Sequence, residues 1–499
     1  MEQLPDHIRP FFEPAIYPHP AAHIEMIQTH ISWVILAGDY AYKFKKPVDF
    51  GFLDFTTLAK RKYFCERELE LNRRISPEIY IDTVPVSEEH GNYSFGERGN
   101  IVDYCLKMRR FSQNDLLDQR LASDSFNAAW MDRLAADTAE FHAESEPNYD
   151  IDHIGLLRSH IETNLNSASR HLESGLNRQT IEVLMQFAEE ELPPLQHLLE
   201  IRQRKGCIRH CHGDLHMKNI TLIDDRPRLF DCIEFNDDFA TIDTMNDVAF
   251  LIMDCDAHGR ADLGMRFLSR YLEFSGDYDG LELLPLYLFY RASVRGKVAC
   301  LLADELDGPQ RQAQLDEAAK YFDLALQYTE SRRGNLFAVA GLSGSGKSHL
   351  ALIGCGIERA VIIRSDATRK RIAPLYPELE LYSREMHILT YRAMFAAANT
   401  ALDAGFPVIL DATFIHPDSR RRLKALADTC DTPPYFYWLD IEPSLLRERI
   451  KARQQQTSDI SDADLHVLAL QLAEYRRPDE AWVHFLGSSN SWPQTPLLL

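Results

Sequence analysis

Three polar residues between His212 and Asp231 have the types and spacing that transfer of a phosphoryl group requires. Asp214 could accept the proton of an attacking hydroxyl, and Asn219, five residues later, could reach a magnesium ion from the same loop. Asp231 follows the apolar pair Leu229-Phe230 and could bridge that ion to phosphate oxygens. The pattern therefore predicts a base at Asp214 and metal ligands at Asn219 and Asp231. We expect His212 to brace the loop rather than to transfer protons.

The same loop has a simpler interpretation, because Asp and Asn often hold a turn through bonds to nearby backbone. A lysine and a glutamate favour the catalytic one. Lys43 and Lys45 share one face of a strand, so either could approach the phosphates of a nucleotide; we prefer Lys43, which is nearer the strand centre. Glu68 falls on the buried face of the next helix, where its charge needs a cation, and Lys43 is the natural candidate.

A second phosphate site is predicted at Gly341–Ser348, which matches every fixed position of the phosphate-binding loop pattern G-x-x-x-x-G-K-[ST]. An apolar strand precedes it and a helix follows, as the pattern requires. Lys347 would contact the β- and γ-phosphates and Ser348 would offer its hydroxyl to magnesium. The remaining nucleotide-binding positions of the loop are Gly341, Ser343, Gly344, Ser345 and Gly346.

An acceptor site would distinguish a phosphotransferase from a simple nucleotide hydrolase. Asp366 follows an apolar strand and could take a hydroxyl proton, while Arg369 could hold a phosphate or another anion. The alternative for Asp366 is a helix N-cap. Asp411 ends another strand and is predicted as a further magnesium ligand. Arg447 and Arg449 could close over the transferring group as a lid, or form an exposed face with nearby glutamates.

The elements that must position these residues fall into two patterns. Strands at 31–37, 40–45, 79–86 and 101–109 with one helix at 56–74 predict a small lobe over about 1–110. Helices at 126–142, 154–201 and 242–328 around short strands at 208–235 predict a mainly helical large lobe over about 111–330. After a polar segment at 330–335, strands at 336–340, 360–363, 407–410 and 435–439 alternate with helices. This predicts a parallel-sheet α/β domain over 335–499.

Composition limits the classes of function. A chain of 499 residues exceeds what one core usually supports. From Gly334 onward the chain has 18 Lys and Arg and 19 Asp and Glu, a net charge of −1. The remaining −20 of the total charge of −21 lies on residues 1–333, which disfavours nucleic-acid binding by that part. Nine cysteines without a Cys-x-x-Cys pair, and no apolar stretch near the roughly 18 residues of a membrane span, indicate a cytoplasmic protein that uses no membrane. Cys207, His210, Cys211 and His212 lack a second ligand pair, so zinc is disfavoured.

Residues 24–328 resemble the aminoglycoside phosphotransferase family, a branch of the protein-kinase-like fold. The resemblance rests on His212-Gly213-Asp214-Leu215-His216 through Asn219, on Asp231, and on Glu140-Phe141-His142. It implies a bilobal fold with ATP between the lobes, Asp214 as base, and Asn219 and Asp231 on magnesium. Cys232-Ile233 replaces the Phe-Gly of protein kinases, and no Gly-x-Gly-x-x-Gly is present, which favours a small-molecule acceptor over a protein.

Residues 335–499 resemble the small P-loop kinases, which include polynucleotide 5'-kinases, gluconate kinase and zeta-toxin-type enzymes. The resemblance implies Asp366 as base, Arg369 as a ligand of an acceptor phosphate, and Arg447 or Arg449 as a lid arginine. The near-neutral charge of this part weakens the polynucleotide option. The whole chain resembles bacterial proteins in which an aminoglycoside phosphotransferase-like kinase is joined to a P-loop ATP-binding domain.

We therefore expect a phosphotransferase that depends on ATP, or on GTP, and on Mg²⁺, with two nucleotide sites. The first would act on a hydroxyl of a small molecule and the second on another hydroxyl acceptor. Two alternatives remain: one domain binds ATP only to regulate the other, or the P-loop part is a polynucleotide 5'-kinase.

Overall fold

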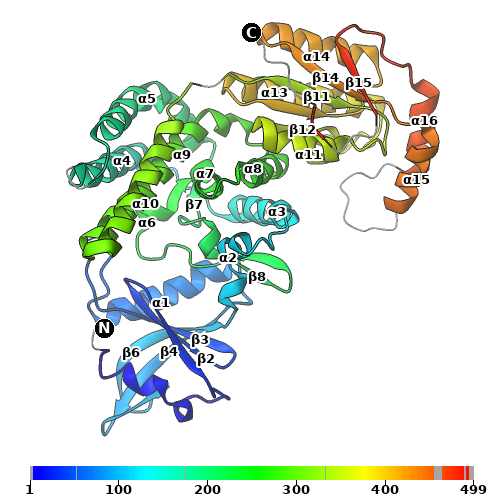
Figure 1. Ribbon diagram of the computed structural model, residues 1–499. Coiled ribbons are helices and arrows are strands. Elements are labelled where there is room, and N and C mark those ends of the chain that lie inside the picture. Colours follow the sequence, from blue (N-terminus) through cyan, green and yellow to red (C-terminus); the bar gives the residue numbers. More distant parts are fainter. Residues whose placement is uncertain are drawn as a thin grey trace. The chain divides into compact units, whose positions relative to one another are not determined.

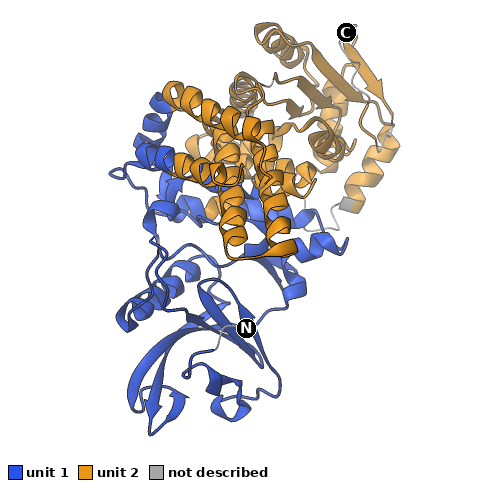
Figure 2. Cartoon of the chain, turned by 60° about the vertical axis from the view of Figure 1, so that its left-hand side comes forward, with its two compact units in different colours: residues 1–137, 141–159, 196–251 blue, residues 138–140, 160–195, 252–499 orange. Residues whose placement is uncertain are grey.

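The computed structural model describes residues 4–51, 53–172, 175–331, 333–453, 464–487 and 491–493. Its contacts divide the chain into two compact units, which Figure 2 shows in blue and orange. Unit 1 contains residues 1–137, 141–159 and 196–251, and unit 2 contains residues 138–140, 160–195 and 252–499. Each predicted phosphate site thus lies within a single unit. Among the described helices, none combines the length and the apolar character that crossing a membrane would need.

Unit 1 begins with a six-stranded antiparallel sheet (Figure 1). The strands, in spatial order, are β1 (Ile24–Gln28), β2 (Ser32–Ala37), β3 (Tyr40–Lys45), β6 (Asn100–Arg109), β4 (Tyr80–Glu89) and β5 (Asn92–Phe95). The predicted β2–β3 hairpin is confirmed. Gly38 adopts φ +58° in its turn, and a Cβ there would come within 2.2 Å of the Pro20 carbonyl oxygen, so a side chain would clash. Helix α1 (Leu58–Arg73) packs on β4 and β6, and its N-cap Thr57 accepts a hydrogen bond from the Lys60 amide.

Two short pairs of antiparallel strands hold the predicted catalytic loop in unit 1. The loop runs from β7 (Ile208–His210) to β8 (Ile220–Ile223), which pairs with β9 (Arg226–Leu229). At its other end β7 pairs with β10 (Thr241–Asp243). The helices around this region are α2 (Leu117–Ala122), α3 (Ala129–Glu144), the short α6 (Asp237–Ala240) and the start of α7 (Thr244–Ala257). The loop is therefore anchored in paired backbone on both sides.

Unit 2 contains a five-stranded sheet in which every pair is parallel, as predicted. The strands, in spatial order, are β12 (Val361–Arg364), β13 (Val408–Asp411), β11 (Leu336–Ala340), β14 (Pro434–Leu439) and β15 (Val483–Leu486). The helices between and after them are α11 (Lys347–Glu358), α12 (Ser365–Ile372), α13 (Arg384–Asp403), α14 (Pro417–Thr429), α15 (Pro443–Arg453) and α16 (Leu465–Glu474). Sequence patterns missed only β15 of this sheet, a four-residue edge strand in which His484 interrupts the apolar residues. The carboxyl ends of β11, β12 and β13 carry the predicted site residues.

The other helices of unit 2 pack partly on this sheet. Helix α8 (Ala261–Ser275) contacts α11, α12 and β12, and α9 (Leu284–Asp304) packs along α10 (Gly308–Gln327). The predicted segment 330–335 connects α10 to β11. The expected helical stretch at 154–201 consists of two helices, α4 (His153–Ser169) and α5 (Arg178–Arg204). Edge strand β12 therefore borders a helix that precedes the parallel sheet in the sequence.

Candidate active sites

The first candidate site is centred on two lysines that share one carboxylate. Lys43 Nζ lies 2.8 Å from Glu68 Oε1 and 2.5 Å from Asp231 Oδ1, and Lys45 Nζ lies 2.8 Å from Glu68 Oε2. Strand β3 supplies both lysines and α1 supplies the glutamate. The predicted pairing of Glu68 with Lys43 is observed, and Lys45 joins it from the same face of β3. Only Lys43 also reaches Asp231.

A fifth charged group, Glu234, completes this cluster. Glu234 contacts Lys45 Nζ, and both side chains are buried. Burial raises the pKa of Glu234, whereas Lys43 and Lys45 outweigh the effect of burial on Glu68 and lower its pKa. Sequence reasoning missed Glu234, although an acidic residue among the apolar neighbours of Asp231 was an available signal. Lys45 is thus fixed by two carboxylates inside the protein, which leaves Lys43 as the lysine nearest the half-exposed Asp231.

The buried carboxylate predicts a large effect on stability. Replacing Glu68 by alanine would leave two buried lysines without their shared partner, so we expect the free energy of unfolding to fall by about 3–5 kcal/mol. Urea unfolding would measure it. The matched control is Glu66→Ala on the same helix, where the exposed pair with Lys62 should contribute no more than about 1 kcal/mol. Equal losses in both variants would contradict this account of the cluster.

Buried side chains anchor the loop that carries Asp214. Asp247 accepts hydrogen bonds from the backbone amides of His212 and Gly213, both at 3.0 Å, and lies 3.1 Å from His142 Nε2. His212 Nε2 lies 2.9 Å from the Phe230 carbonyl oxygen, consistent with a bracing role, and burial lowers its pKa, which keeps the ring neutral. Asp247 lies in the first turn of α7, and its buried side chain anchors the loop.

Three polar side chains of the loop meet, namely those of Asp214, Asn219 and His216. Asn219 Nδ2 donates to Asp214 Oδ2 at 2.8 Å, and His216 Nε2 lies 3.3 Å from the same oxygen. Asp231 adopts φ +64°, and its backbone amide donates to the Tyr80 hydroxyl at 2.8 Å. A left-handed backbone costs energy for a residue other than glycine, so this position is held by its surroundings. Asp214, Asn219 and Asp231 therefore present oxygen atoms within one part of unit 1.

An apolar cluster borders Lys43. Its buried members are Leu36, Ala41, Ile79, Tyr80, Leu106 and Met108, with Phe111 and Phe230 packed against them. Ala41 precedes Lys43 by two residues on β3, and Leu106 is the register partner of Lys43 on β6. The cluster therefore places apolar side chains next to the lysine on β3 and β6.

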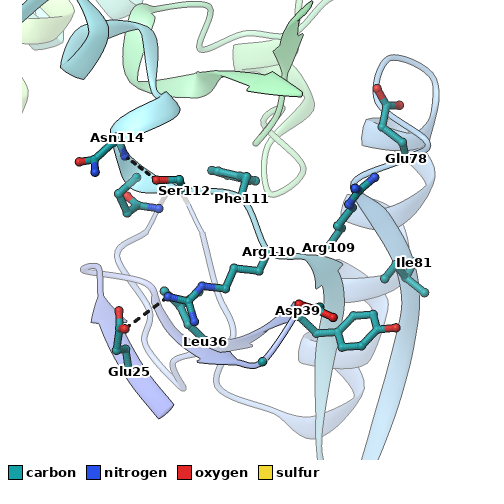
Figure 3. A pocket seen from close by; sticks show the side chains of 13 residues that line it. Glu25, Leu36, Asp39, Glu78, Ile81, Arg109, Arg110, Phe111, Ser112 and Asn114 are labelled. Carbon is teal, nitrogen blue, oxygen red and sulfur yellow. Dashed lines mark hydrogen bonds and ion pairs between the residues drawn. The ribbon is translucent and has the colours of Figure 1, made fainter. Parts of the chain in front are cut away.

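A cavity of about 1010 Å³ lies along the segment that leaves β6 (Figure 3). Leu36 and Phe111 belong both to its wall and to the apolar cluster, and Arg110 Nη2 reaches Glu25 Oε1 at 3.3 Å across it. Its described lining does not include Lys43, Asp214 or Asp231. The large cavity therefore continues the apolar cluster but is not where the charged groups meet.

The second candidate site is built on the loop between β11 and α11. Gly344 and Gly346 have φ of +82° and +96°, and a Cβ on Gly344 would come 3.0 Å from the Leu446 carbonyl oxygen. Lys347 Nζ donates to the Leu342 carbonyl oxygen at 3.0 Å, and the Ser348 hydroxyl donates to Asp411 Oδ2 at 2.6 Å. The two predicted magnesium ligands, Ser348 and Asp411, thus lie next to each other. Burial raises the pKa of Asp411, and Lys347 and Ser348 act against that rise.

A cavity of about 530 Å³ extends from this loop toward α12 and α13. Asp366 and Arg369 both line it, with Arg369 Nη1 2.8 Å from Asp366 Oδ1. The N-cap of α12 is Arg364, so Asp366 lies within the first turn and is not the cap. Further residues along the wall are Tyr382, His387, Tyr391, Thr413, His416 and Glu474. Sequence reasoning missed this aromatic and imidazole wall, to which helix α13 contributes His387 and Tyr391.

The two predicted lid arginines are placed differently. Arg449 lines the cavity and its Nη1 donates to the Ser345 carbonyl oxygen at 3.2 Å. Arg447, on the same helix, is exposed and is not among the described residues that line the cavity. Of the pair, only Arg449 is brought to the phosphate loop. Gln471 from α16 also reaches the loop, since its side chain accepts from the Ser343 amide at 2.9 Å.

His387 predicts a pH dependence of stability. Burial, and then the charges of Arg369 and His416, lower its pKa from 6.5 to about 4. Because the unfolded chain binds this proton more readily, the contribution of His387 is present above pH 6.5 and is lost as the pH falls toward 4. We expect His387→Gln to flatten that acid limb in thermal unfolding. The exposed His466→Gln serves as control; an unchanged limb in His387→Gln would contradict the assignment.

Comparison with known proteins adds a family. Residues 336–478 match the AAA domain model. Two uncharacterized proteins, Rv2004c of Mycobacterium tuberculosis and Mb2027c of Mycobacterium bovis, are each 30% identical over 463 residues, which is 91% of this chain and 91% of theirs. The chain belongs to the family of these mycobacterial proteins. The match spans nearly the whole length, so both units are part of what the family shares.

Solved structures resemble either part of this family member. A choline kinase from Cryptosporidium parvum is 12% identical to this chain, with a TM-score of 0.40. The match covers 61% of this chain and 88% of the choline kinase. The aminoglycoside phosphotransferase APH(2'')-Ib is 14% identical, with a TM-score of 0.33, and the match covers 62% of this chain and 95% of that enzyme. A gluconokinase from Sinorhizobium meliloti is 20% identical, with a TM-score of 0.25, and the match covers 32% of this chain and 85% of the gluconokinase.

The expected fold class is confirmed: a kinase-like part with an antiparallel sheet precedes a parallel-sheet α/β part.

Proposed function

We propose that both units are catalytic and that each transfers the γ-phosphoryl group of ATP, in the presence of Mg²⁺, to a hydroxyl group of a small molecule. One observation carries the proposal. Each unit brings a lysine, a pair of magnesium-type oxygen ligands and a further carboxylate to one place: Lys43 with Asn219, Asp231 and Asp214, and Lys347 with Ser348, Asp411 and Asp366.

In the first site the donor set suits magnesium. Asn219 turns its amide nitrogen to Asp214, so its amide oxygen is the atom offered to a cation, and Asp231 adds a half-exposed carboxylate. A bound magnesium would neutralise charge on the phosphates. Lys43 would hold the α- and β-phosphates, the apolar cluster would take the base of the nucleotide, and Asp214 would accept the proton of the attacking hydroxyl.

In the second site the loop suits a phosphate group. Ser345 Oγ is buried and has no hydrogen-bond partner among the described residues, and glycines on either side of it have positive φ. Lys347 and Arg449 add positive charge, and Ser348 with Asp411 would hold the magnesium. Asp366 would accept the proton of the acceptor hydroxyl, with Arg369 directing the acceptor.

The wall of the second cavity indicates what this acceptor carries. Arg369 is buried, its Nε has no hydrogen-bond partner among the described residues, and Tyr382, His387 and His416 line the same cavity. Donors of this kind fit an anionic, hydroxyl-bearing small molecule. The near-neutral charge of this part of the chain gives a polynucleotide track little support. We place the activity in the cytoplasm, where ATP is available to both sites.

The test is a screen for ATP consumption over sugars, sugar acids, amino alcohols, nucleosides and 5'-hydroxyl oligonucleotides. It is run with the unsubstituted chain and with Asp214→Asn and Lys347→Ala. We expect that one acceptor supports ATP consumption that is lost only in Asp214→Asn, and that another supports ATP consumption that is lost only in Lys347→Ala. If ATP consumption with every acceptor is lost in the same single variant, the other unit is not catalytic.

A regulatory role for the second site is the other candidate, favoured by the contact of α8 with β12 and α11. In that case Lys347→Ala changes the rate or the nucleotide affinity of the first site and removes no product of its own.

A further inference from the structure

A buried group of charges lies beside the P-loop site, on the side covered by α8. Glu273, from the last turn of α8, contacts Arg364 through two nitrogens, Nε to Oε1 and Nη2 to Oε2. Arg270 Nη1 donates to Glu273 Oε2 at 2.8 Å. The three side chains are between 4% and 10% exposed. A carboxylate so deeply buried needs its guanidinium partners, and they need it.

Helix α8 is fixed to the edge of the sheet at the same place. The backbone amide of Ile362, on edge strand β12, donates to Ser269 Oγ at 3.0 Å. The side chain therefore satisfies a donor that an open sheet edge would leave unpaired. One turn further along α8, Glu273 meets Arg364 at the end of the same strand. Neither Ser269 nor Glu273 belongs to the segment 336–478 that matches the AAA domain.

Arg364 stands next to the carboxylate that the magnesium needs. It is the register partner of Asp411 on β13, and both side chains line the cavity at the phosphate loop. Asp411 also accepts the Ser348 hydroxyl at 2.6 Å. A guanidinium beside a carboxylate forms a bidentate ion pair whenever the two can align, and such a pair competes with a cation for the same oxygens.

We propose that Glu273 is a positioning residue of the P-loop site, which holds the Arg364 guanidinium away from Asp411 and so keeps that carboxylate available to magnesium. Arg270, from the same helix, donates to Glu273 Oε2 and so orients that carboxylate. The metal end of the P-loop site is then completed by a helix outside the P-loop segment. This inference rests on the proposed function of the second site.

The test measures magnesium-dependent ADP binding rather than turnover. It uses the full chain with Asp231→Asn, which removes a metal ligand of the first site, and titrates Mg²⁺ at fixed ADP by calorimetry. In this background we expect Glu273→Gln to raise the half-saturating Mg²⁺ concentration about tenfold, because the released Arg364 pairs with Asp411. The double variant Glu273→Gln/Arg364→Gln should return toward the starting value, because the guanidinium of Arg364, the register partner of Asp411, is gone. Any impairment that remains is due to Arg270, which Glu273→Gln also releases.

A matched control separates this role from simple docking of α8. Asp256→Asn weakens a part-buried contact of the preceding helix α7, to Arg359 at the C-cap of α11, where both Asp256 oxygens lie 2.7 Å from Arg359 Nη2. It should leave the magnesium titration unchanged. If Glu273→Gln folds poorly, the single variant Arg364→Gln tests the proposal instead. The proposal requires that Arg364→Gln bind ADP with the same half-saturating Mg²⁺ concentration as the starting chain.

Two results would overturn the proposal: a double variant as impaired as Glu273→Gln, or an Arg364→Gln variant that itself loses magnesium affinity. Failure of the proposed function looks different, because ADP binding at the second site would then show no dependence on Mg²⁺ even with Glu273 and Arg364 intact.

Discussion

Asp214→Asn is expected to lower the rate of phosphoryl transfer at the first site by about 10²–10⁴-fold, the range that positioned general bases contribute. Asparagine has the same shape and can still accept the hydrogen bond that Asn219 donates, so the loop should keep its geometry. What it loses is the capacity to take the acceptor's proton. Nucleotide affinity should change little, because Lys43, Asn219 and Asp231 remain. The measurement is single-turnover formation of the first product, alongside calorimetric binding of ADP.

The control for Asp214→Asn is Asp225→Asn in the β8–β9 turn. Asp225 also has a left-handed backbone and accepts a hydrogen bond from Trp130 Nε1 at 3.0 Å, but it is not part of the cluster around Lys43. Its substitution should leave the first transfer near its original rate. A first product that forms at the normal rate in Asp214→Asn would exclude the proposed base.

Lys347→Ala is expected to remove nucleotide binding from the second site, with a loss of affinity of about 10²-fold or more, as when one partner of a close charge pair is truncated. At nucleotide concentrations that saturate both sites of the unsubstituted chain, the stoichiometry should fall from two to one. Isothermal titration with ADP and Mg²⁺ measures both quantities. The first site should be unaffected, since its lysine and carboxylates lie in unit 1.

The exposed Lys424, which pairs with Asp428 on α14, supplies a control of equal charge change. Lys424→Ala should retain two nucleotides per chain. If Lys347→Ala also retains two, the loop at Gly341–Ser348 is not a nucleotide site. If it binds none, the two sites are not independent.

Local patterns predicted the parts of the sites that depend on neighbours in the sequence. The strand before the phosphate loop, Leu336–Ala340, was predicted to the residue because an apolar run ends where the glycine pattern starts. The contact of Glu68 with Lys43 followed from helical periodicity, since a carboxylate on a buried face needs a cation.

Long-range contacts were out of reach of such patterns. Glu234 joins a cluster with Lys45, from a loop 189 positions away, and no periodicity marks it. Asp247 looks like an ordinary acid in the first turn of a helix, yet it is fully buried and holds the Asp214 loop. The role of α8 at the P-loop site depends on which helix covers β12, which no single-sequence pattern specifies.

The double tether of Glu68 has a consequence for control of the enzyme. Helix α1 is tied to strand β3 by two cations at once, and one of them is also held by Glu234. Swinging this helix outward would remove the carboxylate that both buried ammonium groups share, and would leave Lys43 with Asp231 and Lys45 with Glu234. A switched-off form of that kind would be scarce, so the first module should be permanently assembled, and the supply of its substrates rather than movement of α1 should set how fast it works.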